Sequence, residues 1–159
     1  DLMGIAYTHS GLATSVIAID KELTKQALVP HGIPMPGGRI VTRDELFARD
    51  PLARPYVLKP VNEGSSVGVA IITEGSDCGQ PIRREAEGPW QRFESLLAEP
   101  YIRGRELTAA VLGDRPLLVT ELVPRSGFYD FAAKYTDGMT EHVCPAPIPE
   151  EITALCLDV

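Results

Sequence analysis

Lys59-Pro60-Val61-Asn62-Glu63-Gly64-Ser65-Ser66-Val67-Gly68 is the stretch that decides how this chain is interpreted. The apolar run 56–60 is typical of a buried strand, and it ends next to a lysine. The loop that follows is rich in small residues, so its backbone N–H groups and two hydroxyls can point into one concavity. With the lysine supplying charge, such a loop suits a phosphate group. A β-hairpin turn with glycines at strained positions accounts for the same residues without a ligand, and the stretch alone leaves both interpretations open.

The segments on either side of this loop predict an α+β fold in which antiparallel strands predominate in the middle. Neither a P-loop motif nor a dinucleotide-binding glycine motif occurs, which disfavours both of those folds. One helix is expected over 12–31, with Gly32 as its C-cap. A second, short helix should follow the capping box of Thr42 and Glu45, and a third should have Pro149 as its first residue. Strands are expected at 39–41, 56–60, 67–73, 97–102, 106–112 and 116–122, with a hairpin turn at 113–114 and an irregular segment at 125–140.

The lysines are few enough to be informative. The chain has eleven arginines but four lysines, namely Lys21, Lys25, Lys59 and Lys134. An ammonium group is a compact point charge that can reach a phosphate through a narrow space. Three of the four lie where a binding site can be argued, whereas Lys25 is expected on the solvated surface of its helix. A chance distribution is the alternative.

Two further segments could carry chemistry. Four of the ten aromatic residues fall within 126–135, which predicts either a lid that excludes water or an Ω-loop packed on its own rings. The run 99–102 is extended and could present backbone groups to an adenine edge, with Glu106 near enough to accept hydrogen bonds from a ribose. Because Pro100 has no N–H, a backbone donor there must come from Tyr101 or Ile102.

Composition excludes several classes of function. The net charge of −7 argues against a nucleic-acid or anionic-membrane partner, although it allows a small anionic ligand at a local positive cluster. Three cysteines without a C-x-x-C pair predict neither a disulfide framework nor a zinc site and fit a reducing cytoplasm. No apolar run approaches the ~18 residues of a membrane span. The three histidines lack a nucleophile or metal-ligand partner at motif spacing.

Taken in order, these segments resemble the D-alanine–D-alanine ligases of the ATP-grasp superfamily. The residues that carry the resemblance are Tyr7-Thr8-His9-Ser10-Gly11, Asp20-Lys21, the 59–68 stretch, Glu99 with Gly104-Arg105-Glu106, Phe128-Tyr129-Asp130 with Lys134-Tyr135, and Cys144-Pro145-Ala146. Enzymes of this family use ATP to phosphorylate the carboxylate of one D-alanine. The amine of a second D-alanine attacks the acyl phosphate, which gives D-alanyl-D-alanine for peptidoglycan synthesis. The resemblance therefore implies an ATP-grasp fold of the α+β class.

The resemblance also implies roles for individual residues. The implied ATP-binding residues are Lys21, Lys59, Glu63, Gly64, Ser66, Glu99, Pro100, Ile102, Glu106 and Phe128, and the implied catalytic residues are Ser65, Lys134 and Tyr135. Lys21 and Lys59 are expected to hold the phosphates, and Lys134 to reach the transferring phosphate when the 125–140 loop closes. Ser65 is expected to join a substrate-side network with Tyr135, a tyrosine typical of the dipeptide-forming ligases. Many relatives have a lysine where this chain has Pro100, which removes a side-chain contact to adenine.

The resemblance divides the chain into the end of an N-terminal substrate subdomain (1–20), a central ATP-grasp subdomain (21–98) and the start of a C-terminal one (99–159). Since the chain opens on Asp1 and stops inside a helical pattern, we expect a central fragment. The family's Mg²⁺ or Mn²⁺ ligands are expected beyond residue 159, with none inside the chain. We therefore expect these 159 residues alone to lack ligase activity.

ATP and D-alanine are the implied ligands, and the resemblance implies a cytoplasmic homodimer with no nucleic-acid or membrane partner. Two alternatives stay open. One is another ATP-grasp carboxylate–amine ligase, such as a D-alanine–D-lactate ligase. The other is a non-catalytic nucleotide-binding module that keeps the fold.

Overall fold

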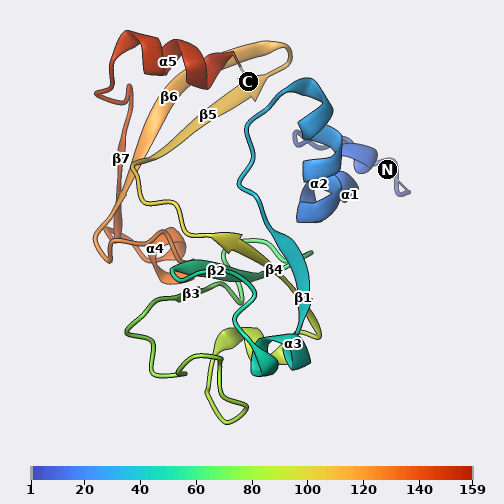
Figure 1. Cartoon of the computed structure of the whole chain (residues 1–159). Coiled ribbons are helices and arrows are strands. Elements are labelled where there is room, and N and C mark those ends of the chain that lie inside the picture. The colour runs from blue at the N-terminus through green and yellow to red at the C-terminus, as the bar shows by residue number, and fades with distance from the viewer. Residues whose placement is uncertain (1, 159) are drawn as a thin grey trace. The chain divides into compact units, whose positions relative to one another are not determined.

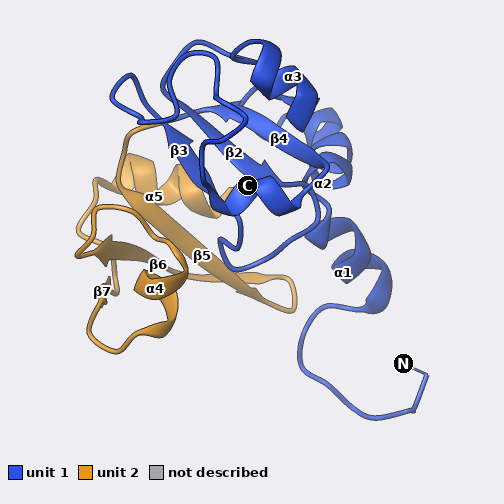
Figure 2. Ribbon diagram, turned by 90° about the horizontal axis from the view of Figure 1, so that it is seen from below, with its two compact units in different colours: residues 1–101 blue, residues 102–159 orange. Residues whose placement is uncertain are grey.

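The computed structural model describes residues 2–158 (Figure 1). The chain divides into two compact units, residues 1–101 and residues 102–159 (Figure 2). Each unit is built around its own antiparallel sheet, as the sequence predicted. The expected three-part division at residues 20 and 98 stays a prediction.

The first unit holds a four-stranded sheet in the order β1-β4-β2-β3. Its strands are β1 (Arg39–Thr42), β2 (Tyr56–Pro60), β3 (Ala70–Ile72) and β4 (Ser95–Pro100). In β2 every second residue is buried, and its other residues are half-buried, so the two faces of the strand differ. The register pairs Val57 with Glu99 and Lys59 with Leu97, which places Lys59 and Glu99 on one face as diagonal neighbours.

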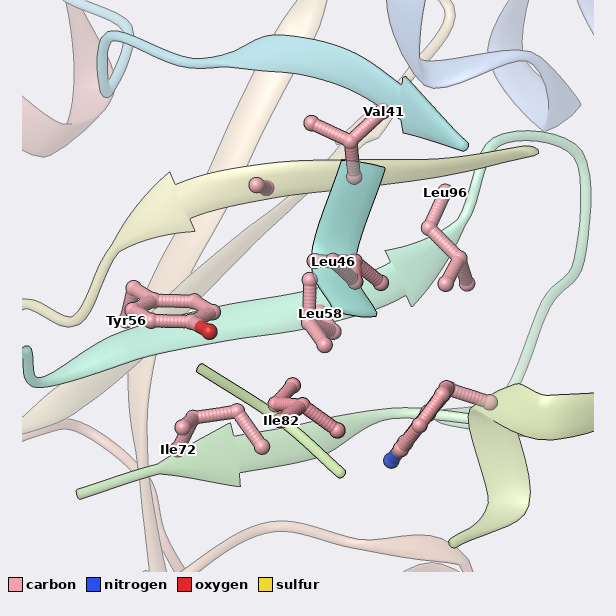
Figure 3. Packing of buried hydrophobic residues seen from close by; sticks show 9 residues of the cluster. Val41, Leu46, Tyr56, Leu58, Ile72, Ile82 and Leu96 are labelled. Atoms are coloured by element: carbon pink, nitrogen blue, oxygen red, sulfur yellow. The ribbon is translucent and has the colours of Figure 1, made fainter. Parts of the chain in front are cut away.

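The opposite face of this sheet carries the hydrophobic core of the first unit (Figure 3). Leu58 and Tyr56 of β2 pack there with Leu46 of α3 (Arg43–Ala48) and Trp90 of η2 (Pro89–Arg92). The other buried members are Val41, Ile72, Ile82, Leu96 and Ala98. Burying one large aliphatic or aromatic side chain contributes about 1.5–3 kcal/mol, so this core holds the charged face in a fixed geometry.

The expected helix over 12–31 is broken in the structure, and its single-helix prediction was wrong. Helix α1 spans Leu12–Ile19, α2 spans Lys21–Leu28, and the 3₁₀ turn η1 spans Val29–His31. Asp20 between the helices is extended, and its carboxylate accepts hydrogen bonds from the N–H groups of Glu22 and Leu23 at 2.9 and 3.0 Å. An aspartate that can cap a helix competes with helix continuation, so α2 starts afresh. The predicted C-cap at Gly32 is confirmed, with φ of 77°.

The second unit is a three-stranded sheet in the order β5-β6-β7. Strands β5 (Glu106–Leu112) and β6 (Arg115–Pro124) form the predicted hairpin, with Gly113 at φ 68° in its turn. The segment 125–140 is more regular than predicted, because α4 (Phe131–Tyr135) lies within it and β7 (Thr140–Val143) follows. The last helix, α5 (Glu150–Leu157), is capped by Pro149 rather than containing it. Within residues 2–158, no helix has the length and apolar character needed to cross a membrane.

Candidate functional site

Two lysines meet one carboxylate on the charged face of the first sheet. The Nζ of Lys25 pairs with Oε1 of Glu99, and the Nζ of Lys59 pairs with Oε2 of the same residue. The side chain of Glu99 is 5% exposed. A carboxylate this deeply buried needs charged partners to offset its lost hydration, so the two lysines hold it in place. The sequence-predicted residues Lys59 and Glu99 are thus brought together.

Lys25 was expected on the solvated helix surface, and this expectation was wrong. Its side chain is 14% exposed, and its ammonium also donates a hydrogen bond to the Pro36 carbonyl at 2.9 Å. Lys21 and Lys25 are four residues apart, which puts both on one face of α2. That spacing from a predicted phosphate-binding lysine was the sequence signal that could have found Lys25.

Lys21 is hydrogen-bonded to the loop that follows β2. Its backbone N–H donates to the Val61 carbonyl at 2.9 Å, and its Nζ donates to the carbonyls of Glu63 at 2.6 Å and Val61 at 3.4 Å. Burial lowers the pKa of Lys21 below its ordinary value, and the positive charge of Lys59 lowers it further. Lys21, Lys25 and Lys59 therefore converge on one region around Glu99.

The loop 61–68 has an unusual backbone. Ser65 and Ser66 adopt φ of 51° and 58°, the left-handed region that non-glycine residues rarely occupy. Gly68 has φ of 70°, and a Cβ built there would clash with Cε2 of Phe93. The hairpin alternative expected strain at glycines, whereas the structure also places it at the two serines. Strained backbone at residues already singled out as ligand-binding candidates is typical of a functional loop.

Gly38 lies against the buried carboxylate. A Cβ at this position would come within 2.6 Å of the Ala98 carbonyl oxygen, 2.8 Å of Cγ of Glu99 and 3.4 Å of Nζ of Lys25. The chain can approach Glu99 this closely because residue 38 has no side chain. The sequence reasoning missed this residue, since one glycine in a Pro-Gly-Gly run carries no distinct signal.

The chemistry of this first cluster suits an anion. The ammonium groups of Lys25 and Lys59 pair with the buried carboxylate of Glu99, and the ammonium of Lys21 lies within electrostatic reach of it. The carboxylate of Asp20 caps α2, and Glu63 is exposed. A ligand with several negative charges would neutralise the excess positive charge of the lysines and could accept hydrogen bonds from the backbone of the loop 61–68.

A second cluster of predicted residues lies in the second unit. The Nζ of Lys134 on α4 stands 5.1 Å above the ring of Tyr129, a cation–π contact. Burial raises the pKa of Glu106 on β5, and the charge of Lys134 acts in the opposite direction. The carboxylate of Asp130 caps α4 by accepting the Ala133 N–H at 2.8 Å. Lys134 and Glu106 are thus brought within electrostatic reach of each other.

The remaining predicted residues are less clustered. Phe128 is half-buried, and its carbonyl accepts hydrogen bonds from Oγ of Ser126 at 2.8 Å and the Asp130 N–H at 3.0 Å. Ile102 is 70% exposed. The N–H of Tyr101 already donates to the Pro55 carbonyl at 3.2 Å. Of the two backbone N–H groups predicted to bind adenine, this leaves the one of Ile102. Gly64 and Pro100 are exposed.

The network expected between Ser65 and Tyr135 joins residues of different units and stays a prediction.

The sequence reasoning missed a set of hydrogen bonds within the second unit. Nε and Nη2 of Arg105 donate to the two carboxylate oxygens of Glu121, each at 2.6 Å, and Nη2 also reaches the Pro147 carbonyl at 3.2 Å. These hydrogen bonds lower the pKa of Glu121, which lies on β6 opposite Leu107 of β5. Over residues 2–158, no group of three or more His, Cys, Asp or Glu side chains is placed to hold a metal ion.

Comparison with known proteins identifies the family. Residues 37–158 match the family model described as D-ala D-ala ligase C-terminus. Over 156 residues the chain is 78% identical to a D-alanine–D-alanine ligase of Erythrobacter litoralis, covering 98% of this chain and 48% of that protein. It is 72% identical over 159 residues to the D-alanine–D-alanine ligase of Novosphingobium aromaticivorans, covering 100% of this chain and 51% of that protein. The chain thus spans about half the length of the curated relatives it matches.

Solved structures agree. The VanG D-Ala:D-Ser ligase of Enterococcus faecalis matches with a TM-score of 0.71 at 28% identity, over 99% of this chain and 47% of that one. The D-alanine–D-alanine ligase of Bacillus anthracis matches with a TM-score of 0.67 at 30% identity, over 96% and 50%. The chain therefore belongs to the D-alanine–D-alanine ligase family and has the ATP-grasp fold that its sequence predicted.

Proposed function

We propose that this protein takes part in the ATP-dependent ligation of two D-alanines to D-alanyl-D-alanine for peptidoglycan synthesis. The observation that carries the proposal is the convergence of Lys21, Lys25 and Lys59 around the buried Glu99, next to the left-handed loop at Ser65 and Ser66. The family membership supplies the reaction class. The structure of the cluster supplies the reason why a nucleotide phosphate would bind there.

ATP, when bound, supplies the phosphoryl group that activates a carboxylate toward attack by an amine. In this proposal Lys21 and Lys59 neutralise its phosphates, and the loop from Glu63 to Ser66 surrounds them with backbone N–H groups and hydroxyls. The backbone that carries the two lysines is fixed by α2 and β2, so binding requires movement of their side chains alone. Ser65 is further proposed to orient the amino-acid substrate together with Tyr135.

Residues of the second unit have proposed roles in ATP binding as well. Glu106 accepts hydrogen bonds from the ribose hydroxyls, and Phe128 packs near the base, whose edge is read by Glu99, Pro100 and Ile102. Lys134 approaches the transferring phosphate from the 125–140 loop, which excludes water. The family implies a divalent cation as well, but the described residues offer no ligand set for one, so no residue of this chain is assigned to it.

A D-alanine–D-serine or D-alanine–D-lactate ligase is the second candidate. The similarity to the VanG D-Ala:D-Ser ligase, at 28% identity and a TM-score of 0.71, keeps this candidate open. Tyr135 favours the dipeptide type, because D-lactate-using relatives usually lack that tyrosine. Competition between D-alanine, D-serine and D-lactate for the second substrate position would distinguish the candidates.

Nucleotide binding by the protein expressed from its complete reading frame, measured by titration calorimetry, is the first test of this function. We expect ATP to bind, and Lys59→Met to weaken ATP binding by about tenfold or more, an effect of about 1.4 kcal/mol. Arg49→Met, at an exposed residue, is the matched control and should bind as the wild type does. Absence of ATP binding by the wild-type chain would overturn the proposal.

Dipeptide formation is the second test, with the protein expressed from its complete reading frame. We expect ATP-dependent release of phosphate only when D-alanine is present. D-alanine-independent hydrolysis, or binding without turnover, would instead support a non-catalytic nucleotide-binding module. We further propose a cytoplasmic homodimer, and light scattering of the purified protein tests the dimer.

A further inference from the structure

Glu99 is held by two lysines of different character. Lys59 lies on β2 next to the loop 61–68, and its side chain is 24% exposed. Lys25 lies on α2, is 14% exposed, and its ammonium is also bound to the Pro36 carbonyl. Each lysine contacts a separate oxygen of the carboxylate. The more exposed lysine is thus the one beside the proposed phosphate site.

The two lysines therefore differ in what they can do when an anion arrives. Lys59 can turn from Glu99 toward a phosphate at the neighbouring loop. The ammonium group of Lys25 is held by two partners, the Pro36 carbonyl and the Glu99 carboxylate, and Gly38 packs closely beside it. If Lys59 moves, Glu99 would be a buried carboxylate with one remaining ion-pair partner, and that partner is Lys25.

We propose that Lys25 is a positioning residue that keeps Glu99 charge-paired and in place, so that Lys59 is free to engage a polyanionic ligand such as the phosphates of a nucleotide. The inference rests on the proposed nucleotide site and deepens it. It assigns Lys25 no contact with the ligand. Its effect passes through Glu99 to Lys59.

The energetics fix the direction of the effect. Breaking a buried ion pair from one side leaves an uncompensated charge and is strongly unfavourable. With Lys25 present, moving Lys59 leaves Glu99 still paired. Without Lys25, Lys59 would be the last ion-pair partner of Glu99, so a phosphate would have to compete with the carboxylate for it.

The quantity that tests this is the phosphate increment, defined as the dissociation constant of adenosine divided by that of ATP. Both ligands would use the adenine-reading groups, but ATP alone would use Lys59. We expect Lys25→Met to lower the phosphate increment about tenfold while changing adenosine affinity less than about twofold. Lys25→Arg, which keeps the charge, should retain most of the increment.

The double variant Lys25→Met/Glu99→Gln separates positioning from general damage. With the carboxylate removed, Lys59 no longer has a competing partner, so the phosphate increment should recover relative to Lys25→Met alone. Gln26→Ala, at the exposed next residue of α2, is the matched control and should leave both affinities unchanged. If Lys25→Met fails to fold, Lys25→Gln takes its place, since it keeps a hydrogen-bond donor for Pro36 without the charge.

The outcomes are distinguishable. A wild-type chain that binds no ATP removes the proposed function and this inference together. A wild-type chain with a large phosphate increment that persists in Lys25→Met and Lys25→Gln overturns this inference and leaves the proposed function intact. Equal weakening of adenosine and ATP, without recovery in the double variant, would mean that Lys25 is merely structural.

Discussion

The two lysine clusters of this chain are built in different ways. In the first unit, Lys25 and Lys59 share the buried Glu99 on a sheet whose other face is a continuous hydrophobic core. In the second unit, Lys134 sits on the five-residue helix α4, contacts one aromatic ring and lies near Glu106. A sheet with a packed face can hold charges in fixed places, whereas a short helix within a loop can change position. We infer that the packed sheet fixes the backbone of the first cluster, so that the Lys59 side chain moves on a rigid support, whereas the support of Lys134 can itself move.

The largest effect is expected from a variant that removes a side chain from the hydrophobic core behind the first cluster. Leu58→Ala on β2, whose side chain is fully buried, should lower the free energy of unfolding by about 2–5 kcal/mol because it leaves a cavity. Urea unfolding measures the loss. Leu112→Ala on β5, 66% exposed, is the matched control and should change stability by less than about 0.5 kcal/mol. Equal losses in the two variants would contradict the contrast between the units.

The carboxyl groups of Asp50 and Glu106 should respond to acid in opposite directions. Burial of Asp50 favours its neutral form, but hydrogen bonds from Arg54 and from Tyr56 at 2.7 Å outweigh that effect and hold its pKa below the ordinary 3.8. A carboxyl with a depressed pKa stabilises the fold above that ordinary value, and the stability is lost as pH falls through the lowered pKa. The pKa of Glu106 is raised above 4.5, so its contribution is present below pH 4.5 and is lost as pH rises.

Asp50→Asn is the variant that isolates the first of these effects. We expect it to lower the free energy of unfolding by about 1.5–3 kcal/mol at pH 7, the range for hydrogen bonds to charged groups, with the difference shrinking below about pH 4. Asp77→Asn, at an exposed residue, is the control. Amide hydrogen exchange followed over pH reads the two units separately. A difference between Asp50→Asn and wild type that is independent of pH would argue against the ionic role of Asp50.

The close packing of Gly38 against Glu99 gives a third test. Gly38→Ala would force a Cβ against the Ala98 carbonyl and Cγ of Glu99, and overpacking of this kind costs about 1–3 kcal/mol. Gly37→Ala is the matched control, because a Cβ there meets nothing within 4 Å. Thermal unfolding and ATP titration should show a loss for residue 38 and none for residue 37. Equal behaviour of the two variants would mean that the sheet edge is not tightly fitted to Glu99.

The smallest expected effect concerns the cap of the second cluster. Asp130→Ala removes the N-cap of α4 and should cost about 1 kcal/mol locally, which loosens the segment that carries Lys134. Limited proteolysis of the 125–140 segment should become faster, with little change in global unfolding. Asp137→Ala, an exposed residue of the same segment, is the control. Unchanged proteolysis in Asp130→Ala would show that the cap does not hold this segment.

Much of the fold could be predicted because it depends on local pattern. The apolar run 56–60 and the capping box of Thr42 and Glu45 appear in the structure as β2 and α3. The break at Asp20 could not be read from apolar spacing, because that spacing continues through it and capping geometry decides the outcome. β7 was missed because its pairing partner, β6, lies across the intervening loop and helix.

The candidate site shows the same limit. Lys59 and Glu99 were identified as separate motifs, but the diagonal register that makes them partners exists only in the paired sheet. Gly38 was missed because its importance comes from what it contacts. Lys25 was assigned to the helix surface because its partner, Glu99, is far away in the sequence. Sequence reasoning therefore identified the chemical groups, and the tertiary structure assigned their partners.

The left-handed backbone at Ser65 and Ser66 has a kinetic consequence. Each residue in that conformation carries strain of about 1–3 kcal/mol, which the surrounding structure sustains. Serine also has a narrower range of accessible conformations than glycine, so the loop keeps its shape between encounters with a ligand. We therefore expect association with an anion to proceed without a preceding rearrangement of this loop. The residence time of the ligand would then be set by later movements elsewhere in the molecule.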